Sequence, residues 1–324
     1  MNPEKIRKKI LLTDYAWDDL VPERARIEAA GHELINLHKA HPAPEVITAL
    51  CAEHRPQAVM TVWAIVNEQA IAHCENLRIV ARVGVGLDNI DRRAVAARGA
   101  IVTNVPDYCM EEMSDHAMAL LLSWARRTVE YDREVKRGTW DPSRIGPQRV
   151  RNLTVGIAGC GRIGRLVARK LSGFGCRVLA YSRTRDRDVP GVDWVDFETL
   201  LDRSDAVVGL LPLSPETRHI FDARAFKRMK AGSLLINISR GPLVNNEDLI
   251  AALDSGRIGH AALDVVEGEP TPPAWVTAHP KVIATPHVAF SSPASVEELR
   301  ERAFGEVIRV LAGEPPRNPV PPPN

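Results

Sequence analysis

The sequence predicts an α/β protein built from two doubly wound parallel-sheet domains. Its 324 residues correspond to about two domains at roughly 100–200 residues per domain. Two series of short apolar segments alternate with helical patterns, one before Pro106 and the other after Leu153. This alternation is typical of an open parallel sheet covered by helices. A glycine-rich turn joins a strand to a helix at the start of the second series, where such sheets bind ligands.

In the first series, helices and strands alternate at the spacing of βαβ units. Two of the expected helices end at glycines, Gly31 and Gly99, and glycine accommodates the left-handed conformation that closes many helices. We expect strands at 10–12, 33–37, 58–62, 78–83 and 101–104, and helices at 23–30, 44–54 and 90–98.

Pro106 interrupts this series before the second one begins. A long helix is expected at 110–127, where Met113, Ala117 and Leu121 repeat at helical spacing. The polar stretch 138–151 indicates a connection or an arm. We expect the strands of the second series at 154–158, 177–181, 206–211, 233–238, 261–265 and 282–285.

The last clear helix, expected at 295–311, would return to pack on the first domain. The chain would then cross twice between the domains, with a cleft between them. One domain would comprise 1–105 and 289–324, and the other would comprise 106–288. The tail 313–324 carries six prolines and is expected to have no fold of its own.

The composition excludes several functional classes. The formal net charge is +1, so no overall field attracts a nucleic acid. No apolar run approaches the ~18–20 residues of a membrane span, and the short apolar run after the basic N-terminus does not resemble a secretory signal. The five cysteines include no C-x-x-C pair. We therefore expect a cytoplasmic protein with neither a disulfide framework nor a metal site.

The turn Gly-Cys-Gly-Arg-Ile-Gly at 159–164 predicts a dinucleotide site, because it follows a strand and opens a helix. Gly159 allows the tight turn, Gly161 lets a pyrophosphate approach the backbone, and Gly164 lets the helix pack on the strand. Free N–H groups and the dipole at the helix start would hold the anion. The domain 106–288 is therefore expected to bind the cofactor.

The end of the following strand favours NADP over NAD. An acidic residue there would bond the ribose 2′-hydroxyl of NAD, but this position is Ser182, followed by Arg183 and Thr184. Arg183 could pair with a 2′-phosphate, and the two hydroxyls could donate hydrogen bonds. The alternative is a solvated basic loop that binds nothing.

Three further strands end in polar segments that would share the carboxyl edge of one sheet. They carry Arg240, Glu269 and His287. Arg240 could clamp a carboxylate through two hydrogen bonds. His287 could protonate a forming alkoxide, and Glu269, hydrogen-bonded to the imidazole, would orient it and favour its protonated form. Together these side chains suit the reduction of a 2-oxo acid.

With these motifs, the chain resembles the D-isomer-specific 2-hydroxyacid dehydrogenase family. The stretch 104–124 looks most like the branch that includes the C-terminal-binding co-repressors. The resemblance spans about 59–311 and rests on six segments in family order: 84–91, 159–164, 211–217, 237–244, 263–270 and 285–287.

The resemblance implies a Rossmann cofactor domain, a flavodoxin-like substrate domain and a homodimer with much of its contact in 110–147. It implies that Arg240, Glu269 and His287 are catalytic. From the residue arguments above and the resemblance together, we expect cofactor contacts at Gly159, Gly161, Arg162, Ile163, Gly164, Ser182, Arg183, Thr184, Leu211, Pro212, Thr217, Ile238, Arg240, Asp264 and His287, and the resemblance places Asp264 beside the nicotinamide carboxamide. It implies substrate contacts at Trp63, Val85, Gly86, Arg240 and His287.

Two departures from the family pattern concern the substrate. Phe290 stands where a small residue is usual, which would narrow the pocket. The loop at 62–66 lacks the usual Arg or Ser, which hints at a small or apolar substituent. We expect stereospecific reduction of a small 2-oxo acid, such as glyoxylate, hydroxypyruvate or pyruvate, to the D-2-hydroxy acid. The alternative is a dinucleotide-sensing, co-repressor-like dimer with little turnover. A third alternative is the oxidation of formate or phosphite, and Glu269 argues against the formate enzyme.

Overall fold

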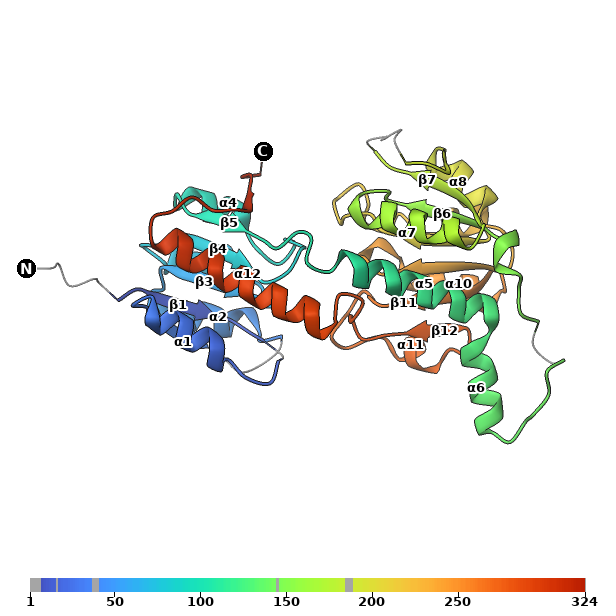
Figure 1. Ribbon diagram of the computed structural model, residues 1–324, viewed down its shortest axis with the longest axis horizontal. Coiled ribbons are helices and arrows are strands. Elements are labelled where there is room, and N and C mark those ends of the chain that lie inside the picture. The colour runs from blue at the N-terminus through green and yellow to red at the C-terminus, as the bar shows by residue number, and fades with distance from the viewer. Residues whose placement is uncertain (1–6, 16, 37–40, 144–145, 184–188, 324) are drawn as a thin grey trace, which may run out of the picture. The chain divides into compact units, whose positions relative to one another are not determined.

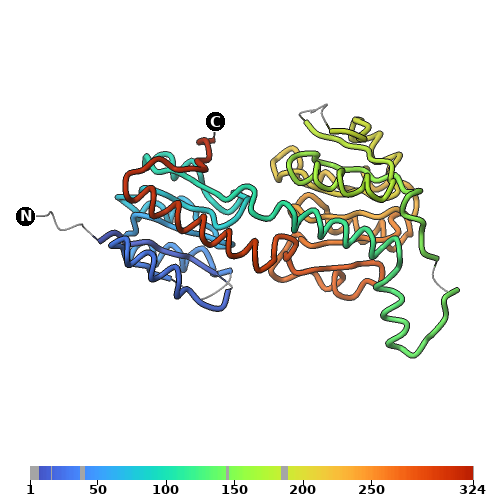
Figure 2. The backbone as a smooth tube through the Cα atoms, in the orientation of Figure 1, coloured from blue at the N-terminus to red at the C-terminus, as the bar shows by residue number. Residues whose placement is uncertain are grey.

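The protein separates into two compact units. The computed structural model describes residues 7–15, 17–36, 41–143, 146–183 and 189–323. One unit comprises residues up to Tyr108 together with Ser292 onward, and the other runs from Cys109 to Ser291. In Figure 1 and Figure 2 the C-terminal helix α12 (Pro293–Leu311) lies among the elements of the first unit. Each unit is built on a parallel sheet covered by helices, to which unit 1 adds one antiparallel edge strand, so the predicted fold class is confirmed.

The sheet of unit 1 has the strand order β13-β5-β4-β3-β1-β2. The chain runs outward from β1 to β2 and then in the opposite direction through β3, β4 and β5, which is the flavodoxin-like order. Its strands are β1 (Lys9–Leu12), β2 (Glu33–Asn36), β3 (Ala58–Thr61), β4 (Ile79–Arg82), β5 (Ile101–Thr103) and β13 (Pro319–Val320). Besides α12, its helices are α1 (Val21–Ala29), α2 (Pro44–His54), α3 (Glu68–Ala72) and α4 (Arg92–Ala97).

Apolar strands and side-chain caps explain this local structure. All four residues of β3 are buried, as expected for a central strand with helices on both faces. The Asn67 and Asp91 side chains accept hydrogen bonds from backbone N–H groups at the starts of α3 and α4, which satisfies donors that lack helical partners. The short helix α3 was not expected from the sequence because it is only one turn long and has no clear periodicity.

The sheet of unit 2 has the order β12-β11-β10-β9-β6-β7-β8. Strands β7 and β8 are added on one side of β6, and β9 to β12 are added on its other side. The glycine turn after β6 therefore lies at the topological switch point of the sheet. The strands are β6 (Thr154–Ala158), β7 (Arg177–Tyr181), β8 (Val192–Trp194), β9 (Ala206–Gly209), β10 (Ser233–Asn237), β11 (Ile258–Leu263) and β12 (Val282–Ala284). The helices are α5 (Met110–Arg126), α6 (Thr128–Lys136), α7 (Arg162–Gly173), α8 (Phe197–Arg203), α9 (Ala223–Arg228), α10 (Asn246–Asp254) and α11 (Ala274–Ala278).

The expected helix at 110–127 is correct as α5, but the chain then continues as a second helix that the sequence did not reveal. Arg127 adopts a left-handed conformation between them, with φ of 56°. Its Nη1 lies 3.2 Å from Oε1 of Glu130 and 2.8 Å from Nε2 of His260 on β11. Burial alone would raise the pKa of Glu130, but hydrogen bonds from His260 and Arg127 outweigh it and lower that pKa. This cluster attaches α6, which buries no residue of its own and projects from unit 2 in Figure 1.

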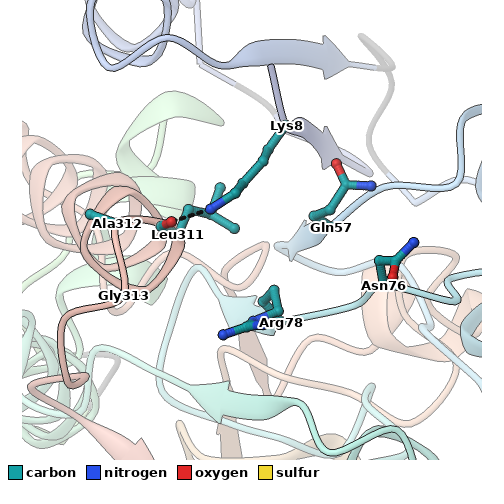
Figure 3. Close-up of a pocket in the computed structure, with 7 residues that line it drawn as sticks. All are labelled: Lys8, Gln57, Asn76, Arg78, Leu311, Ala312 and Gly313. Carbon is teal, nitrogen blue, oxygen red and sulfur yellow. Dashed lines mark hydrogen bonds between the residues drawn. The ribbon is translucent and has the colours of Figure 1, made fainter. Parts of the chain in front are cut away.

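A cavity of about 340 Å³ opens at the amino edge of the unit 1 sheet. Figure 3 shows the side chains of Lys8, Gln57 and Arg78, each of which directly precedes a strand. Lys8 Nζ donates a hydrogen bond to the carbonyl of Leu311 at the end of α12. The cavity therefore lies at the edge opposite to that where the strands β3 and β4 end.

Among the described helices, none is both long and apolar enough to cross a bilayer.

The proline-rich tail is ordered, contrary to expectation. β13 pairs antiparallel with β5, Val320 opposite Val102. The carboxylate of Glu306 on α12 is buried and accepts hydrogen bonds from the backbone N–H groups of Arg317 and Asn318 at 2.5 and 3.0 Å. Proline tolerates this edge position because an edge strand needs only part of its hydrogen-bonding capacity. Tertiary contacts with α12 and β5 therefore supply the order that the tail lacks alone.

We expect Glu306→Ala to detach the tail. Two backbone N–H groups lose their acceptor, which costs about 1–3 kcal/mol of unfolding free energy. Chemical denaturation would measure that loss, and limited proteolysis would show early cleavage C-terminal to α12. Glu297→Ala is the matched control, since Glu297 lies on the same helix with an exposed side chain. Equal stability and equal protease resistance of both variants would contradict this role of Glu306.

Candidate active site

The glycine turn of unit 2 is shaped by close backbone contacts. Gly159 has φ of 106°, and a Cβ at this position would lie 2.6 Å from the carbonyl of Leu210. A Cβ on Gly164 would lie 2.6 Å from the Gly159 oxygen. Both positions therefore require glycine for the fold itself. Gly161 differs, because a Cβ there would meet nothing within 4 Å.

Helix α7 begins at this turn with its backbone donors available. Gly161 is the N-cap residue, and no side chain caps the helix. Val167 and Leu171 bury the other face of α7 in the core. The turn thus leaves open space beside uncapped N–H groups and the positive end of the helix dipole, which fits the pyrophosphate of a dinucleotide. Arg162 is exposed and Ile163 half-buried at the same helix start.

Ser182 and Arg183 directly follow β7 at the same edge of the sheet. Ser182 is half-buried and Arg183 exposed. A hydrogen bond from the Ser214 hydroxyl, with a contribution from the charge of Arg183, lowers the pKa of Glu216. Arg183 thus lies within electrostatic reach of the loop after β9. Thr184, also named from the sequence, lies outside the described residues.

The loop after β9 contains Leu211, Pro212 and Thr217. The hydroxyl of Thr217 donates to the Pro212 carbonyl at 2.6 Å and accepts the Ser214 N–H at 2.8 Å. Thr217 therefore closes this loop internally. The Leu211 carbonyl accepts a hydrogen bond from Ser239 Oγ at 2.6 Å, so the loop is tied to the end of the adjacent strand β10.

Arg240 lies three residues beyond the end of β10. Ile238 before it is buried, and Asn237 Nδ2 donates to the Arg240 carbonyl at 2.9 Å. Nη1 of Arg240 donates to the Ser239 carbonyl at 2.7 Å. A Cβ on the next residue, Gly241, would lie 2.2 Å from the carbonyl carbon of Val266. Close packing of the β10 and β11 loops therefore fixes the backbone that carries the guanidinium.

Glu269 and His287 come together after β11 and β12. The Nδ1 of His287 lies 3.1 Å from Oε1 of Glu269, and both side chains are about one-third exposed. Because a carboxylate only accepts, the hydrogen bond places a proton on Nδ1 of His287. No described residue hydrogen-bonds Nε2. The sequence-predicted pairing of a histidine with a carboxylate is therefore present in the geometry.

Asp264 holds the turn that carries His287. The residue is 2% exposed, and its carboxylate accepts hydrogen bonds from the backbone N–H groups of Val288 and Ala289 at 2.9 and 3.0 Å. The Thr285 hydroxyl donates to the same carboxylate at 2.6 Å. The sequence analysis connected Asp264 only with the nicotinamide, and it did not foresee this structural task.

The substrate residues named in unit 1 follow the ends of its central strands. Trp63 comes after β3, and its backbone N–H donates at 2.6 Å to the buried carboxylate of Asp14. Val85 comes after β4, is 38% exposed, and its carbonyl accepts a hydrogen bond from Asn104 at 2.8 Å. Gly86 follows in the same half-buried loop. The residues that the sequence analysis named as substrate contacts therefore lie in loops at the carboxyl edge of the unit 1 sheet.

Some residues of this region were missed at the sequence level. His219 Nε2 lies 2.8 Å from Oε2 of Glu267, whose carboxylate also pairs with Arg218. His116 on α5 lies 3.0 Å from the Thr285 hydroxyl. The spacing of these partners along the chain ranges from 48 to 169 residues, so no local pattern could have paired them. Within the described ranges, no cluster of three or more ligand-type side chains could hold a metal ion.

Gly161→Ala separates ligand contact from folding. The added methyl meets no protein atom within 4 Å, so the melting temperature should stay near that of the parent. Dinucleotide affinity should fall about tenfold or more, because the methyl occupies the space that the pyrophosphate needs. Gly159→Ala is the comparison variant and should lose stability. Isothermal calorimetry and thermal melting check both; undiminished affinity of Gly161→Ala would contradict the site.

The chain matches known proteins along most of its length. Residues 118–289 match the family model described as the NAD binding domain of D-isomer specific 2-hydroxyacid dehydrogenases. A glyoxylate reductase from Korarchaeum cryptofilum is 37% identical over 310 residues, which cover 93% of each chain. A glyoxylate reductase from Thermococcus litoralis is 37% identical over 265 residues, 79% of this chain and 80% of the relative.

Solved structures agree with this assignment. An NADPH-dependent glyoxylate/hydroxypyruvate reductase from Sinorhizobium meliloti, solved with NADP and malonate, aligns with a TM-score of 0.85 at 27% identity and covers 97% of both chains. A Thermus thermophilus protein aligns with a TM-score of 0.88 at 30% identity, covering 97% of this chain and all of its own. The chain is therefore an oxidoreductase that belongs to the D-isomer specific 2-hydroxyacid dehydrogenase family.

Proposed function

We propose that the protein reduces a small 2-oxo acid of the glyoxylate, hydroxypyruvate or pyruvate class to the D-2-hydroxy acid, with NADPH as the preferred cofactor. The hydrogen bond between Nδ1 of His287 and Glu269, 3.1 Å long, carries the proposal. It leaves Nε2 to face a substrate oxygen. The names of the glyoxylate reductase relatives support the substrate class.

The cofactor would be held along the carboxyl edge of the unit 2 sheet. The backbone N–H groups at 161–164 would bind the pyrophosphate, with Arg162 and Ile163 beside it. The loop containing Leu211, Pro212 and Thr217 would border the adenine side, and Ile238 and Asp264 the nicotinamide side. When bound, the nicotinamide supplies the hydride.

His287, Glu269 and Arg240 would perform the proton and charge chemistry. As the substrate carbonyl carbon gains a hydride, negative charge develops on its oxygen. The protonated His287 donates its Nε2 proton to that oxygen, and Glu269 stabilises the imidazolium and fixes its orientation. Arg240 binds the substrate carboxylate through its planar guanidinium and stabilises the developing charge. Val85 and Gly86 would donate backbone N–H groups to the carboxylate, and Trp63 would border the substituent.

The preference for NADPH rests on the residues after β7. Ser182 lacks the negative charge that would repel a 2′-phosphate, and Arg183 is exposed beside it. One similar structure was solved with NADP and another with NAD, so the proposed preference depends on this chain's own residues. The charge of Arg183 contributes to the lowered pKa of Glu216, so the guanidinium lies within electrostatic reach of the loop after β9. Thr184 would complete the site.

We also propose a cytoplasmic homodimer whose contact includes 110–147. Helix α6 has no buried residue within its own chain. Val135 on α6 and Trp140 after it are 46% and 87% exposed, and exposed apolar side chains on a projecting segment are typical of an interface. The described cysteines are all free thiols, which is consistent with a reducing compartment.

A substrate panel tests the proposed function directly. Glyoxylate, hydroxypyruvate, pyruvate and phenylpyruvate are each assayed with NADPH and with NADH. At least one 2-oxo acid should be turned over, with kcat/KM about ten- to a hundredfold higher for NADPH, the factor for one charge-assisted hydrogen bond. Ser182→Asp should shift the preference toward NADH. Tight NADPH binding without any turnover would favour a dinucleotide-sensing scaffold instead, and a preference for NADH would exclude the cofactor assignment.

Glu269→Gln tests the proton donor. The variant keeps a hydrogen-bond acceptor but removes the negative charge that favours imidazolium. Reduction needs protonated His287, so the rate profile of reduction should move to lower pH. The oxidation of the hydroxy acid needs the neutral ring, so its profile should move in the same direction. Rates measured between about pH 5 and 9 decide this; an unchanged profile would remove Glu269 from the mechanism.

Arg240→Lys tests the carboxylate clamp. Lysine keeps the charge but cannot form two parallel hydrogen bonds, so KM should rise, kcat should fall, and kcat/KM should drop about ten- to a hundredfold. Arg257→Lys is the matched control, because its hydrogen bonds within the described part of the chain go to the backbone carbonyls of Phe226, Lys227 and Met229. That control should lose melting temperature with little change in kcat. A stability loss at Arg240 without a kinetic change would assign it a structural role.

A further inference from the structure

A second histidine, His116, contacts the turn of His287 from helix α5. Its Nε2 lies 3.0 Å from Oγ1 of Thr285 and 3.7 Å from Oδ1 of Asp264. His116 is far from His287 in sequence, and within the described part of the chain it hydrogen-bonds neither the His287 ring nor Glu269. We propose that His116 is a positioning residue that fixes the His287 turn through Thr285 and Asp264. The proposal deepens the proposed function, since it rests on His287 as proton donor.

The turn needs external support because its backbone is strained. His287 has φ of 54°, a left-handed conformation that costs a non-glycine residue free energy. Its backbone N–H donates to the Asp264 carbonyl at 2.8 Å. The N–H groups of Val288 and Ala289 donate to the Asp264 carboxylate. Three successive amides therefore bind one residue, and the position of Asp264 decides where the His287 ring lies.

The hydrogen bond between His116 and Thr285 can run in one direction only. The Asp264 carboxylate, when ionised, only accepts, so the single hydroxyl hydrogen of Thr285 points to its Oδ1 at 2.6 Å. Oγ1 of Thr285 has then only lone pairs left for His116. Nε2 of His116 must carry a hydrogen and donate it. The chain of donors runs from His116 through Thr285 to Asp264.

The hydrogen-bond relay from His116 through Thr285 to Asp264 is hard to replace because its side chains are buried. The Asp264 side chain is 1% exposed and that of His116 20%, so bulk water does not readily replace a lost partner. A donor that points at Thr285 also holds the hydroxyl in the rotamer that serves Asp264. Hydrogen bonds in such a chain strengthen one another in a region of low dielectric. Loss of the His116 donor should therefore loosen the turn without removing any group that touches the substrate.

NMR tests the relay without relying on activity. Long-range ¹H–¹⁵N correlation of the imidazole rings in the parent protein should show His116 as the Nε2–H tautomer. Thr285→Val should speed hydrogen exchange of the Val288 and Ala289 amides, while Thr285→Ser, which keeps the hydroxyl, should not. An Nδ1–H tautomer, or equal exchange in both variants, would overturn the proposal.

Kinetics then test positioning against a purely structural role. His116→Leu should lower kcat about tenfold while KM changes less than about twofold, as for a misplaced catalytic group. His116→Gln, whose side-chain N–H can replace Nε2–H, should retain most of kcat. In a Thr285→Val background, His116→Leu should add little further loss, because coupled residues are not additive. Equal loss in the Gln and Leu variants, or additive losses in the double variant, would overturn the proposal.

The two sets of readouts separate this proposal from the function it rests on. A parent protein that turns over no 2-oxo acid would overturn the proposed function, and the positioning role with it. The tautomer and amide exchange would in that case show whether the hydrogen-bond relay itself is present.

Discussion

A buried carboxylate, that of Asp264, organises the polar edge of the second unit. Removing a charged group from water is costly unless hydrogen bonds replace its hydration. Here two backbone N–H groups and the Thr285 hydroxyl bind it. The same interactions hold the loop after β12 against the end of β11. His287 therefore owes its position to the solvation requirement of a neighbouring residue.

Close backbone contacts supply the second constraint. A Cβ on Gly159 or Gly241 would lie 2.6 or 2.2 Å from backbone atoms of a neighbouring loop, and a Cβ on Gly164 would lie 2.6 Å from the Gly159 oxygen in the same turn. The loop after β6 thus packs closely against the loop after β9, and the loop after β10 packs closely against the loop after β11. Gly161 alone in the turn faces open space. This contrast distinguishes glycines required for folding from a glycine whose lack of a side chain benefits a ligand.

At this site buried residues hold the backbone, while the side chains proposed to react are partly exposed. Asp264 and Ile238 are buried, whereas the side chains of Glu269 and His287 are about one-third exposed. Such an arrangement is consistent with the proposed hydride transfer to a small acid, since the reacting groups must meet substrate while their supports stay fixed. Phe290, whose ring lies 6.2 Å from that of His287 edge-on, adds apolar surface beside the proposed proton donor.

Local patterns in the sequence determined much of this protein. Alternation of apolar segments predicted both parallel sheets, because central strands with two covered faces need continuous apolar residues. The sequence also placed the glycine turn and the polar residues after β10, β11 and β12 at the carboxyl edge of one sheet, because the strands of a parallel sheet all end at the same edge. The family itself and the absence of an acidic residue at Ser182 were also visible without coordinates.

Only the tertiary structure decided which distant residues meet. The tail 313–324 was expected not to fold because it is rich in proline, yet β5 and the Glu306 carboxylate order its described part. The chain turns at Arg127 into a second helix because Glu130 and His260 bind its guanidinium. His116 reaches Thr285 across 169 residues. Hydrogen bonds between side chains depend on distance in space and not on periodicity along the chain, so these partnerships could not be predicted from the sequence.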